Sequence, residues 1–221
     1  EEVCARIPYN NEAVKVMIVN GFERLAAAQA VDTDTLRGFD MKQDPGVAYI
    51  SNTSIYDLNG MPIAGNTFDY PSMHGKVLAQ MGISYVSSSI NAIESLTPYT
   101  LVDIIMGKEK GEKTDTIGCI PMHLREAINT YTQQGGKILL TGSYIASDMR
   151  HTCDTAWTHN TMHYRYKTEK ASTCGRINFQ YNILPTQQYE YYTKPNPQVI
   201  ECEWPDGIEP MTGGVRIARY D

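Results

Sequence analysis

A serine follows directly after a predicted buried strand, at a point where a reactive side chain would stand clear of a sheet. The stretch Thr141-Gly142-Ser143-Tyr144 closes the apolar run KILLT and turns at once into a predicted helix, IASDM. This is the arrangement of a nucleophile elbow, in which a serine hydroxyl lies above the sheet beside backbone N–H groups. The final glycine of the G-x-S-x-G pattern is absent. The alternative hypothesis is that Ser143 caps the helix that follows it.

His74 is the candidate base, because a serine needs a base beside it to become nucleophilic at neutral pH. His74 and Asp69 lie in the stretch NTFDYPSMHG, at the start of a predicted helix and so at the same end of the sheet as Ser143. Asp69 would orient the imidazole. In the alternative, Asp69 satisfies loop amides and His74 packs against the sheet edge.

Four further residues are candidates for binding at the same end of the sheet. Gly142 and Tyr144 flank the serine and would supply backbone amides near an oxyanion. Glu109 follows the apolar run LVDIIMG, and Asp148 follows the elbow, so both are acidic candidates. Each acid has the alternative role of a solvated or capping residue.

These candidates need strands whose carboxyl ends meet at one edge, since ligand sites of open α/β sheets lie outside those ends. Buried strands are predicted at 14–20, 83–89, 101–107 and 137–141 from short, β-branched apolar runs. With two helices between them, this order predicts a three-layer, doubly wound, mostly parallel α/β sheet of flavodoxin-like type, with right-handed crossovers.

The first connecting helix is predicted from its caps and from one apolar face. Ser72 would be the N-cap, and Gly82 sits where a glycine after the last turn belongs. The predicted core face consists of Met73, Val77 and Met81, at i, i+4 and i+8.

The second connecting helix is the clearest in the chain. Pro121 suits its first turn, and Gly135 follows its end. Leu124, Ile128 and Tyr131 recur at i, i+4 and i+7, which predicts a buried stripe facing the sheet.

The whole of 1–221 is predicted to be one α/β domain, with its core at 14–150 and a polar-aromatic insertion and sheet-edge strands at 151–221. Residues 21–71 predict a decorated loop, and loops of this length are usually functional. The missing initiator Met and the strand-like ending indicate a piece of a longer polypeptide. Weaker strands are predicted near 177–183, 199–203 and 215–220.

Composition excludes several classes of protein. The net charge of −6 leaves no basic stripe for phosphate backbones, so nucleic acid is not expected as a partner. Neither a membrane span nor a signal peptide is visible in the sequence. The many Tyr, Asn and Thr residues are typical of extracellular proteins and favour a secreted, periplasmic or cell-surface location.

A cluster of His and Cys residues lies in 151–174. His159 and His163 have the i, i+4 spacing of zinc ligands on a helix, but no cysteine pair has ligand spacing. Three alternatives stay open: a metal site, a disulfide between Cys153 and Cys174, or free thiols. We predict no cofactor.

Aromatic residues gather in the C-terminal third, where they either stack on sugar rings or pack one face of a strand. The first alternative makes carbohydrate or cell-wall glycan a candidate partner. The residues are Tyr164, Tyr166, Phe179, Tyr181, Tyr189, Tyr191, Tyr192 and Trp204.

The stretches VKVMIVNGFERL, GFDMKQDPGVAYI, GNTFDYPSMHGKVL, VDIIMGKEKG and ILLTGSYIASDM resemble a family of exported Bacteroidetes proteins labelled xanthan lyase or N-acetylmuramoyl-L-alanine amidase, often with a golvesin-like module. The resemblance implies a class I glutamine amidotransferase-like core. Where such enzymes carry a cysteine nucleophile, this chain has Ser143. Two functions remain open: a hydrolase-like domain acting on an amide or ester of cell-wall or polysaccharide material, and a non-catalytic glycan-binding or scaffold domain.

Overall fold

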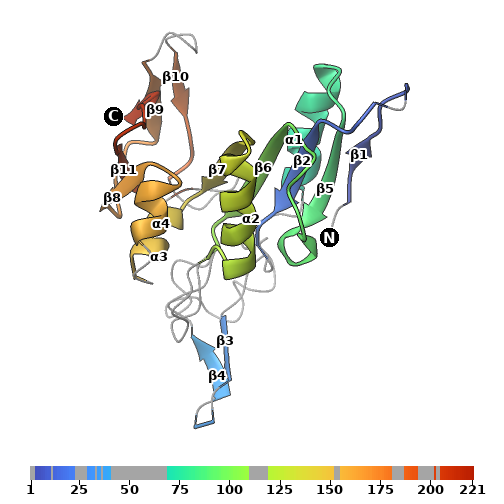
Figure 1. Ribbon diagram of the computed structural model, residues 1–221. Coiled ribbons are helices and arrows are strands. Elements are labelled where there is room, and N and C mark those ends of the chain that lie inside the picture. Colours follow the sequence, from blue (N-terminus) through green and yellow to red (C-terminus); the bar gives the residue numbers. More distant parts are fainter. Residues whose placement is uncertain are drawn as a thin grey trace, which may run out of the picture.

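A computed structural model gives the architecture of the chain (Figure 1). It describes residues 3–10, 12–22, 29–32, 34–35, 37–40, 69–109, 119–151, 155–180, 187–193, 202 and 205–221.

The centre of the molecule is a five-stranded sheet in the order β1-β5-β2-β6-β7. The last four strands of this order run parallel, and only β1 pairs antiparallel, with β5. The sheet is therefore mostly parallel, as predicted. Its strands are β1 (Ala5–Arg6), β2 (Val16–Asn20), β5 (Tyr85–Ser89), β6 (Leu101–Gly107) and β7 (Lys137–Gly142).

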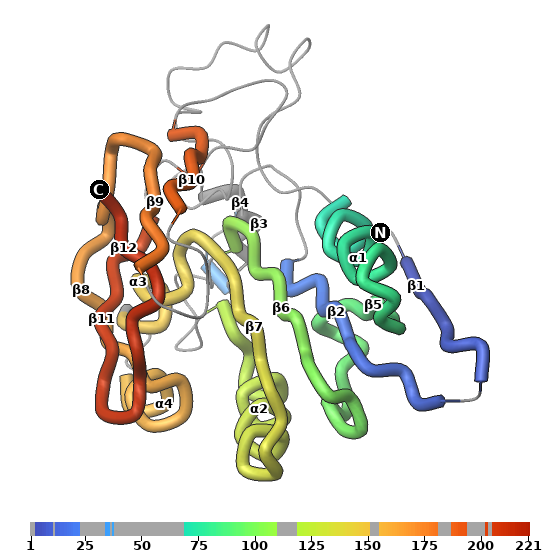
Figure 2. Tube along the Cα trace, turned by 90° about the horizontal axis from the view of Figure 1, so that it is seen from above, coloured from blue at the N-terminus to red at the C-terminus, as the bar shows by residue number. Residues whose placement is uncertain are grey.

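Helices cover both faces of this sheet. Helix α1 (Tyr70–Gln80) lies over one face and α2 (Met122–Gln133) over the other, as Figure 2 shows. A short 3₁₀ turn, η2 (Ile90–Ala92), joins β5 to β6. The coarse prediction of an α/β fold is confirmed.

Alternate residues of β2 and β6 point to the two faces and build two cores. On the α2 side, residues such as Val19, Ile104 and Met106 pack against the buried face of α2, whose predicted stripe is confirmed. On the α1 side the core is smaller, and its fully or nearly buried members are Val16, Ile18, Phe22, Tyr85 and Ile105.

The predicted core face of α1 is wrong. Met73, Val77 and Met81 are 55%, 55% and 66% exposed. The helix instead approaches the sheet through buried Gly75, where an added Cβ would come within 2.6 Å of the Tyr85 ring. A small residue sets this contact, so a pattern of large apolar residues could not find it.

Helix α1 also begins earlier than predicted. Its N-cap is Asp69, Pro71 lies in its first turn, and Ser72 donates its hydroxyl to the Asp69 carbonyl instead of capping. The end is as expected, because Gly82 follows the helix with a φ of +73°.

The C-terminal third forms two short helices and small antiparallel sheets beside β7. One sheet pairs β8 with β11, and the other has the order β10-β9-β12. The elements are α3 (Ile145–His151), α4 (Thr155–Asn160), β8 (Tyr164–Thr168), β9 (Arg176–Phe179), β10 (Gln188–Glu190), β11 (Gly207–Pro210) and β12 (Ala218–Tyr220).

The weaker predictions have mixed outcomes. β9 overlaps the predicted strand at 177–183 and β12 lies within that at 215–220, while all but one residue of 199–203 lie outside the described residues. The sequence analysis did not predict β8, β10 and β11. Within the predicted loop 21–71, a hairpin of β3 (Gln29–Asp32) and β4 (Arg37–Asp40) is described, and 41–68 lie outside the description.

The contact between Gly75 and Tyr85 predicts an unusual response to alanine. Gly75→Ala should lower the free energy of unfolding by about 1–3 kcal/mol, because the buried ring has no room to move away. Helix propensity alone would raise it by roughly 1 kcal/mol. Urea unfolding measures the difference, with Lys76→Ala on the exposed face as control. A Gly75→Ala protein as stable as wild type would contradict this packing.

Candidate functional site

A histidine–carboxylate pair joins α1 to the middle of the central sheet. Nδ1 of His74 lies 2.6 Å from Oδ2 of Asp103. His74 comes from the second turn of α1, and Asp103 is the third residue of β6. The pair is a direct polar link between a helix and the parallel sheet.

The two partners differ in exposure. The side chain of Asp103 is 7% exposed, and that of His74 is 37% exposed. The hydrogen bond to Asp103 raises the pKa of His74, burial of the ring opposes this, and the charge of Asp103 adds to the increase. A buried carboxylate thus holds one nitrogen of a partly exposed imidazole.

Two buried oxygen atoms on the α1 side of the sheet have no hydrogen-bond partner in the described part of the chain. They are Oδ1 of Asp103 and Oδ1 of Asn20, whose amide nitrogen donates to the Phe22 carbonyl. Asn20 pairs with Ile105, so it lies on the same face as Asp103 and roughly 8 Å from it. Unpaired buried acceptors are rare and call for a donor from elsewhere.

These residues flank the point where the strand order reverses. The chain passes from β2 through α1 to β5 on one side of β2, and then to β6 on the other side. Ligands of open α/β sheets bind at such a switch point, at the carboxyl ends of the strands. Asn20 and Asp103 lie on the two strands that border it.

Asp69 is not the acid that contacts Nδ1 of His74. It is exposed at the start of α1, where its carbonyl accepts hydrogen bonds from the Met73 amide and the Ser72 hydroxyl. Asp103 occupies the orienting position that the sequence analysis assigned to Asp69.

Ser143 and His74 are not brought together. Asp103 pairs with Leu139, and Ser143 lies four residues further along the chain, which is roughly 13 Å along a strand. The hydroxyl of Ser143 lies 3.4 Å from Sγ of Cys202, and its carbonyl accepts the Asp206 amide. The serine therefore contacts the C-terminal part of the chain.

One backbone amide of the predicted oxyanion site, that of Ser143, is also engaged. The Ser143 amide donates to the Gly107 carbonyl at 2.8 Å. The Asp206 carboxylate accepts both the amide and the hydroxyl of Ser147, in the first turn of α3. A negative charge at this helix start would repel an oxyanion.

Gly142 has a packing role. An added Cβ would lie 2.8 Å from Cβ of Met106 and 3.0 Å from side-chain atoms of Ile145. Tyr144 accepts the Asp148 amide and the Ser147 hydroxyl at its carbonyl, within the first turn of α3.

Asp148 and Glu109 lie near the buried thiol of Cys119. The Asp148 carboxylate accepts the Cys119 amide at 2.5 Å. Burial raises the pKa of the Cys119 thiol well above its usual value, and the charges of Asp148 and Glu109 raise it further. The thiol is therefore neutral at physiological pH and is not a nucleophile.

The structure bears on the three alternatives for the His and Cys cluster at 151–174: a metal site, a disulfide or free thiols. Cys174 is a free thiol, which argues against the Cys153–Cys174 disulfide, and Cys153 itself lies outside the described residues. Its Sγ contacts the Ser172 hydroxyl and the Asp221 carbonyl. Among the residues with described positions, no group of three or more His, Cys, Asp or Glu side chains is arranged to hold a metal ion.

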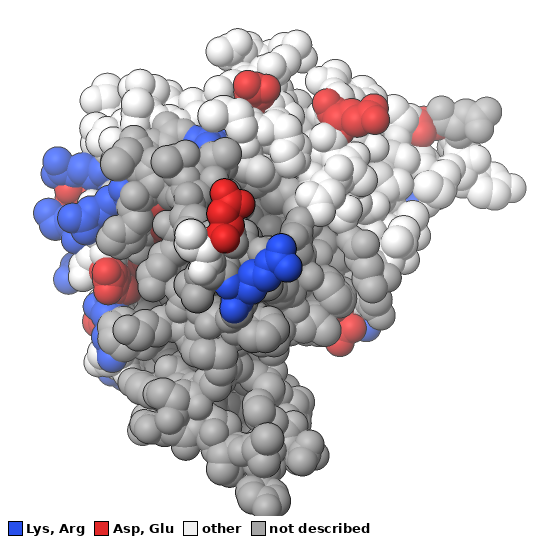
Figure 3. Space-filling model, turned by 90° about the horizontal axis from the view of Figure 1, so that it is seen from below, with Lys and Arg blue, Asp and Glu red and all other residues white. Residues whose placement is uncertain are grey.

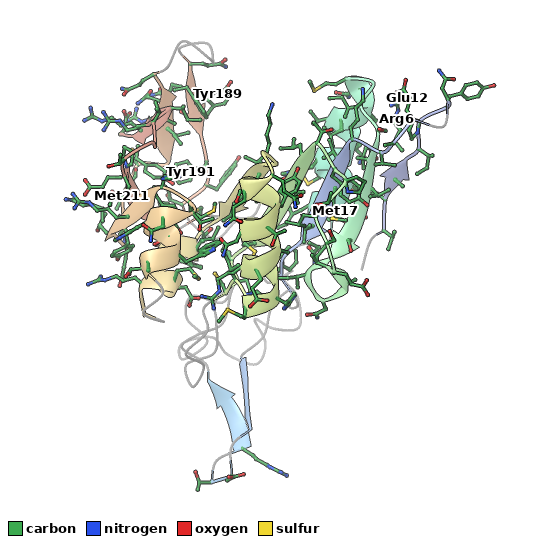
Figure 4. All side chains as sticks on the ribbon, viewed as in Figure 1. Arg6, Glu12, Met17, Tyr189, Tyr191 and Met211 are labelled. Atoms are coloured by element: carbon green, nitrogen blue, oxygen red, sulfur yellow. The ribbon has the colours of Figure 1, made fainter. Side chains whose placement is uncertain are left out.

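Several of the aromatic residues pack against one another. Phe179 and Tyr189 meet edge to face at 5.3 Å, and Tyr191 and Tyr220 do so at 6.0 Å. Figure 4 shows Tyr189 and Tyr191 in the C-terminal strands. Burial raises the pKa of Tyr220 to about 12. Tyr181 and Trp204 lie outside the described residues.

The sequence analysis missed Asp103, although a signal was present. A single acid interrupts the otherwise apolar strand LVDIIMG. Carboxylates are almost never fully buried unless paired, so this residue demanded a partner on the facing helix.

Comparisons with known proteins found no relative of this chain. No protein-family model matches the chain, and no curated protein or solved structure matches it. Within the described residues, no helix has the length and apolar character needed to cross a membrane.

The raised pKa of His74 predicts a pH-dependent stability. Folded protein holds the His74 proton more tightly than unfolded protein, so this contribution is complete below about pH 6.5 and disappears as pH rises through the raised pKa. Urea unfolding from about pH 6 to about pH 9 should show that loss in wild type and not in His74→Asn. His123→Asn is the control, because that ring contacts a carbonyl. Identical slopes in wild type and His74→Asn would refute the assignment.

The hydrogen bonds of the Asp206 carboxylate predict that this side chain stabilises the attachment of the C-terminal strands to the core. Asp206→Ala should lower the free energy of unfolding by about 1–2 kcal/mol, since two donors at the start of α3 lose their acceptor. Glu169→Ala, at an exposed position, is the matched control. Equal stability of the two variants would argue against this link.

Proposed function

We propose that this chain is a hydrolase-like domain that acts on an amide or ester bond, with His74 as its general base. The observation that carries the proposal is the 2.6 Å contact between Nδ1 of His74 and the buried carboxylate of Asp103. A histidine held by a buried acid is the orienting half of many hydrolytic sites.

The pair has a defined chemical role in this proposal. Asp103 accepts the Nδ1–H bond, so the lone pair of a neutral imidazole is at Nε2. Nε2 takes a proton from the nucleophile, which attacks the carbonyl carbon, and the imidazolium then protonates the leaving alcohol or amine. No hydroxyl or thiol among the described residues hydrogen-bonds Nε2, so we assign the nucleophile to water or to a substrate hydroxyl.

The proposed substrate class is cell-wall or polysaccharide material. It is supported by the resemblance of the sequence to exported proteins labelled xanthan lyase or N-acetylmuramoyl-L-alanine amidase.

We extend the proposal to the specific fold type and to the protein family of the chain. The order β5-β2-β6-β7 agrees with a flavodoxin-like or class I glutamine amidotransferase-like core. We also propose membership of the exported family that the sequence resembles, and with it a secreted, periplasmic or cell-surface location.

A second candidate function has an observation in its favour. The nucleophile position of amidotransferase-like enzymes is held by Ser143, whose hydroxyl contacts Cys202, and the adjoining helix start is bound by Asp206. A domain that kept the fold and binds glycan without catalysis, or acts as a scaffold, would have this arrangement.

Hydrolysis assays separate the two functions. Wild type should hydrolyse nitrophenyl esters or peptidoglycan amides, and His74→Asn should lose on the order of 100-fold in rate. The wild-type rate should rise with pH through the raised pKa of His74. Ser143→Ala is the matched variant, and a loss below about threefold is expected because Ser143 does not contact the base.

Other outcomes are equally informative. A large loss in Ser143→Ala would restore the serine as nucleophile. Absence of hydrolysis in wild type, together with glycan binding measured by calorimetry, would establish the non-catalytic function.

A further inference from the structure

Two strand edges face each other across a cavity of about 960 Å³ beside the central sheet. One edge belongs to β7, which pairs only with β6 in the described part of the chain. The other belongs to the extended segment 214–220, which contains β12 and pairs only with β9 there. Figure 2 shows the C-terminal strands on the side of β7 away from β6.

We propose that this cavity, named here the inter-edge groove, binds an extended acidic peptide from another protein as an added β-strand. The peptide would lie between β7 and segment 214–220 and pair with one or both. This binding function is separate from the hydrolytic site and does not depend on it.

The backbone is the first argument for a peptide. An open strand edge presents a row of N–H and C=O groups that matches the backbone of another strand. Paired strands lie about 4.8 Å apart, and recognition by strand addition uses such an edge. A glycan offers no matching alternation of donors and acceptors.

The walls of the inter-edge groove supply the second argument. Leu139, Ile208, Val215 and Ile217 line it and are 47%, 54%, 61% and 43% exposed. Val215 and Ile217 lie two residues apart in the segment just before β12, which matches the spacing of alternate side chains on an added strand. Their exposure is explained if an apolar peptide face covers them.

The basic side chains that line the inter-edge groove favour an acidic peptide. Lys167, Arg216 and Arg219 line the inter-edge groove, in a chain whose net charge is −6. Of these, Lys167 already forms an ion pair with Glu209 at 3.6 Å. The one lining carboxylate of the groove, Asp206, is committed to the start of α3. Arg216 and Arg219 form no ion pair with the described residues. Figure 3 shows Lys and Arg side chains gathered on the side where the C-terminal strands lie.

A selection experiment tests the proposal with a defined probe. A random library of 12-residue peptides is displayed and selected on the immobilised wild-type chain. Enriched peptides should alternate apolar residues with Asp or Glu. The same peptides, synthesised with alternate backbone amides N-methylated to block strand pairing, should bind at least about tenfold more weakly by fluorescence anisotropy.

Matched variants locate the binding site. Val215→Glu, inside the groove, should weaken binding about tenfold, while Ile7→Glu, equally exposed but far from it, should not. Arg216→Glu with Arg219→Glu should weaken it severalfold at low salt, and this difference should shrink at about 0.5 M salt. Circular dichroism checks that each variant is folded.

Three results would overturn the proposal. They are enrichment of no peptide, peptides whose N-methylated forms bind equally well, and peptides that bind Val215→Glu as tightly as Ile7→Glu. Binding of an acidic polysaccharide that competes for the groove, with no peptide enriched, would assign it to a glycan instead.

Discussion

A carboxylate buried in the middle of a parallel sheet is the constraint on which the site depends. Asp103 sits on β6 between Ile18 of β2 and Leu139 of β7, where its side chain is 7% exposed. An ionised carboxylate there is unfavourable unless a donor reaches it. His74 is that donor. The position of α1 and the chemistry of the site therefore both depend on this hydrogen bond.

The way α1 approaches the sheet follows from this requirement. Gly75, next to His74, lets the helix lie against the Tyr85 ring, and the imidazole then reaches the sheet at 2.6 Å. Met73 and Val77 of α1 remain exposed as a result, while Tyr70 and Leu78 pack against the core. At the β7 edge of the sheet, Asp206 ties the C-terminal strands to the start of α3 and contacts the Ser143 turn.

Much of the core was predictable from the sequence, because buried parallel strands are short apolar runs. The strand Leu101–Gly107 appears with the predicted bounds, and the stripe of α2 is buried as its spacing indicates. The face of α1 was not predicted, since its two buried residues are Pro71 and Gly75, which carry no large apolar side chain. The pairing of Asp103 with His74 was not predicted, because spacing along the chain does not reveal which residues meet across a helix–sheet interface. The acid inside an apolar strand was the available clue.

The most direct test of the account is the protonation of His74 itself, observed by long-range ¹H–¹⁵N NMR through a pH titration. The account predicts a pKa above about 6.5 and a neutral form protonated at Nδ1, with Nε2 bare and able to accept a proton. Asp103→Asn should remove the increase in pKa. A neutral form protonated at Nε2, or a pKa that Asp103→Asn leaves unchanged, would contradict the role assigned to the pair.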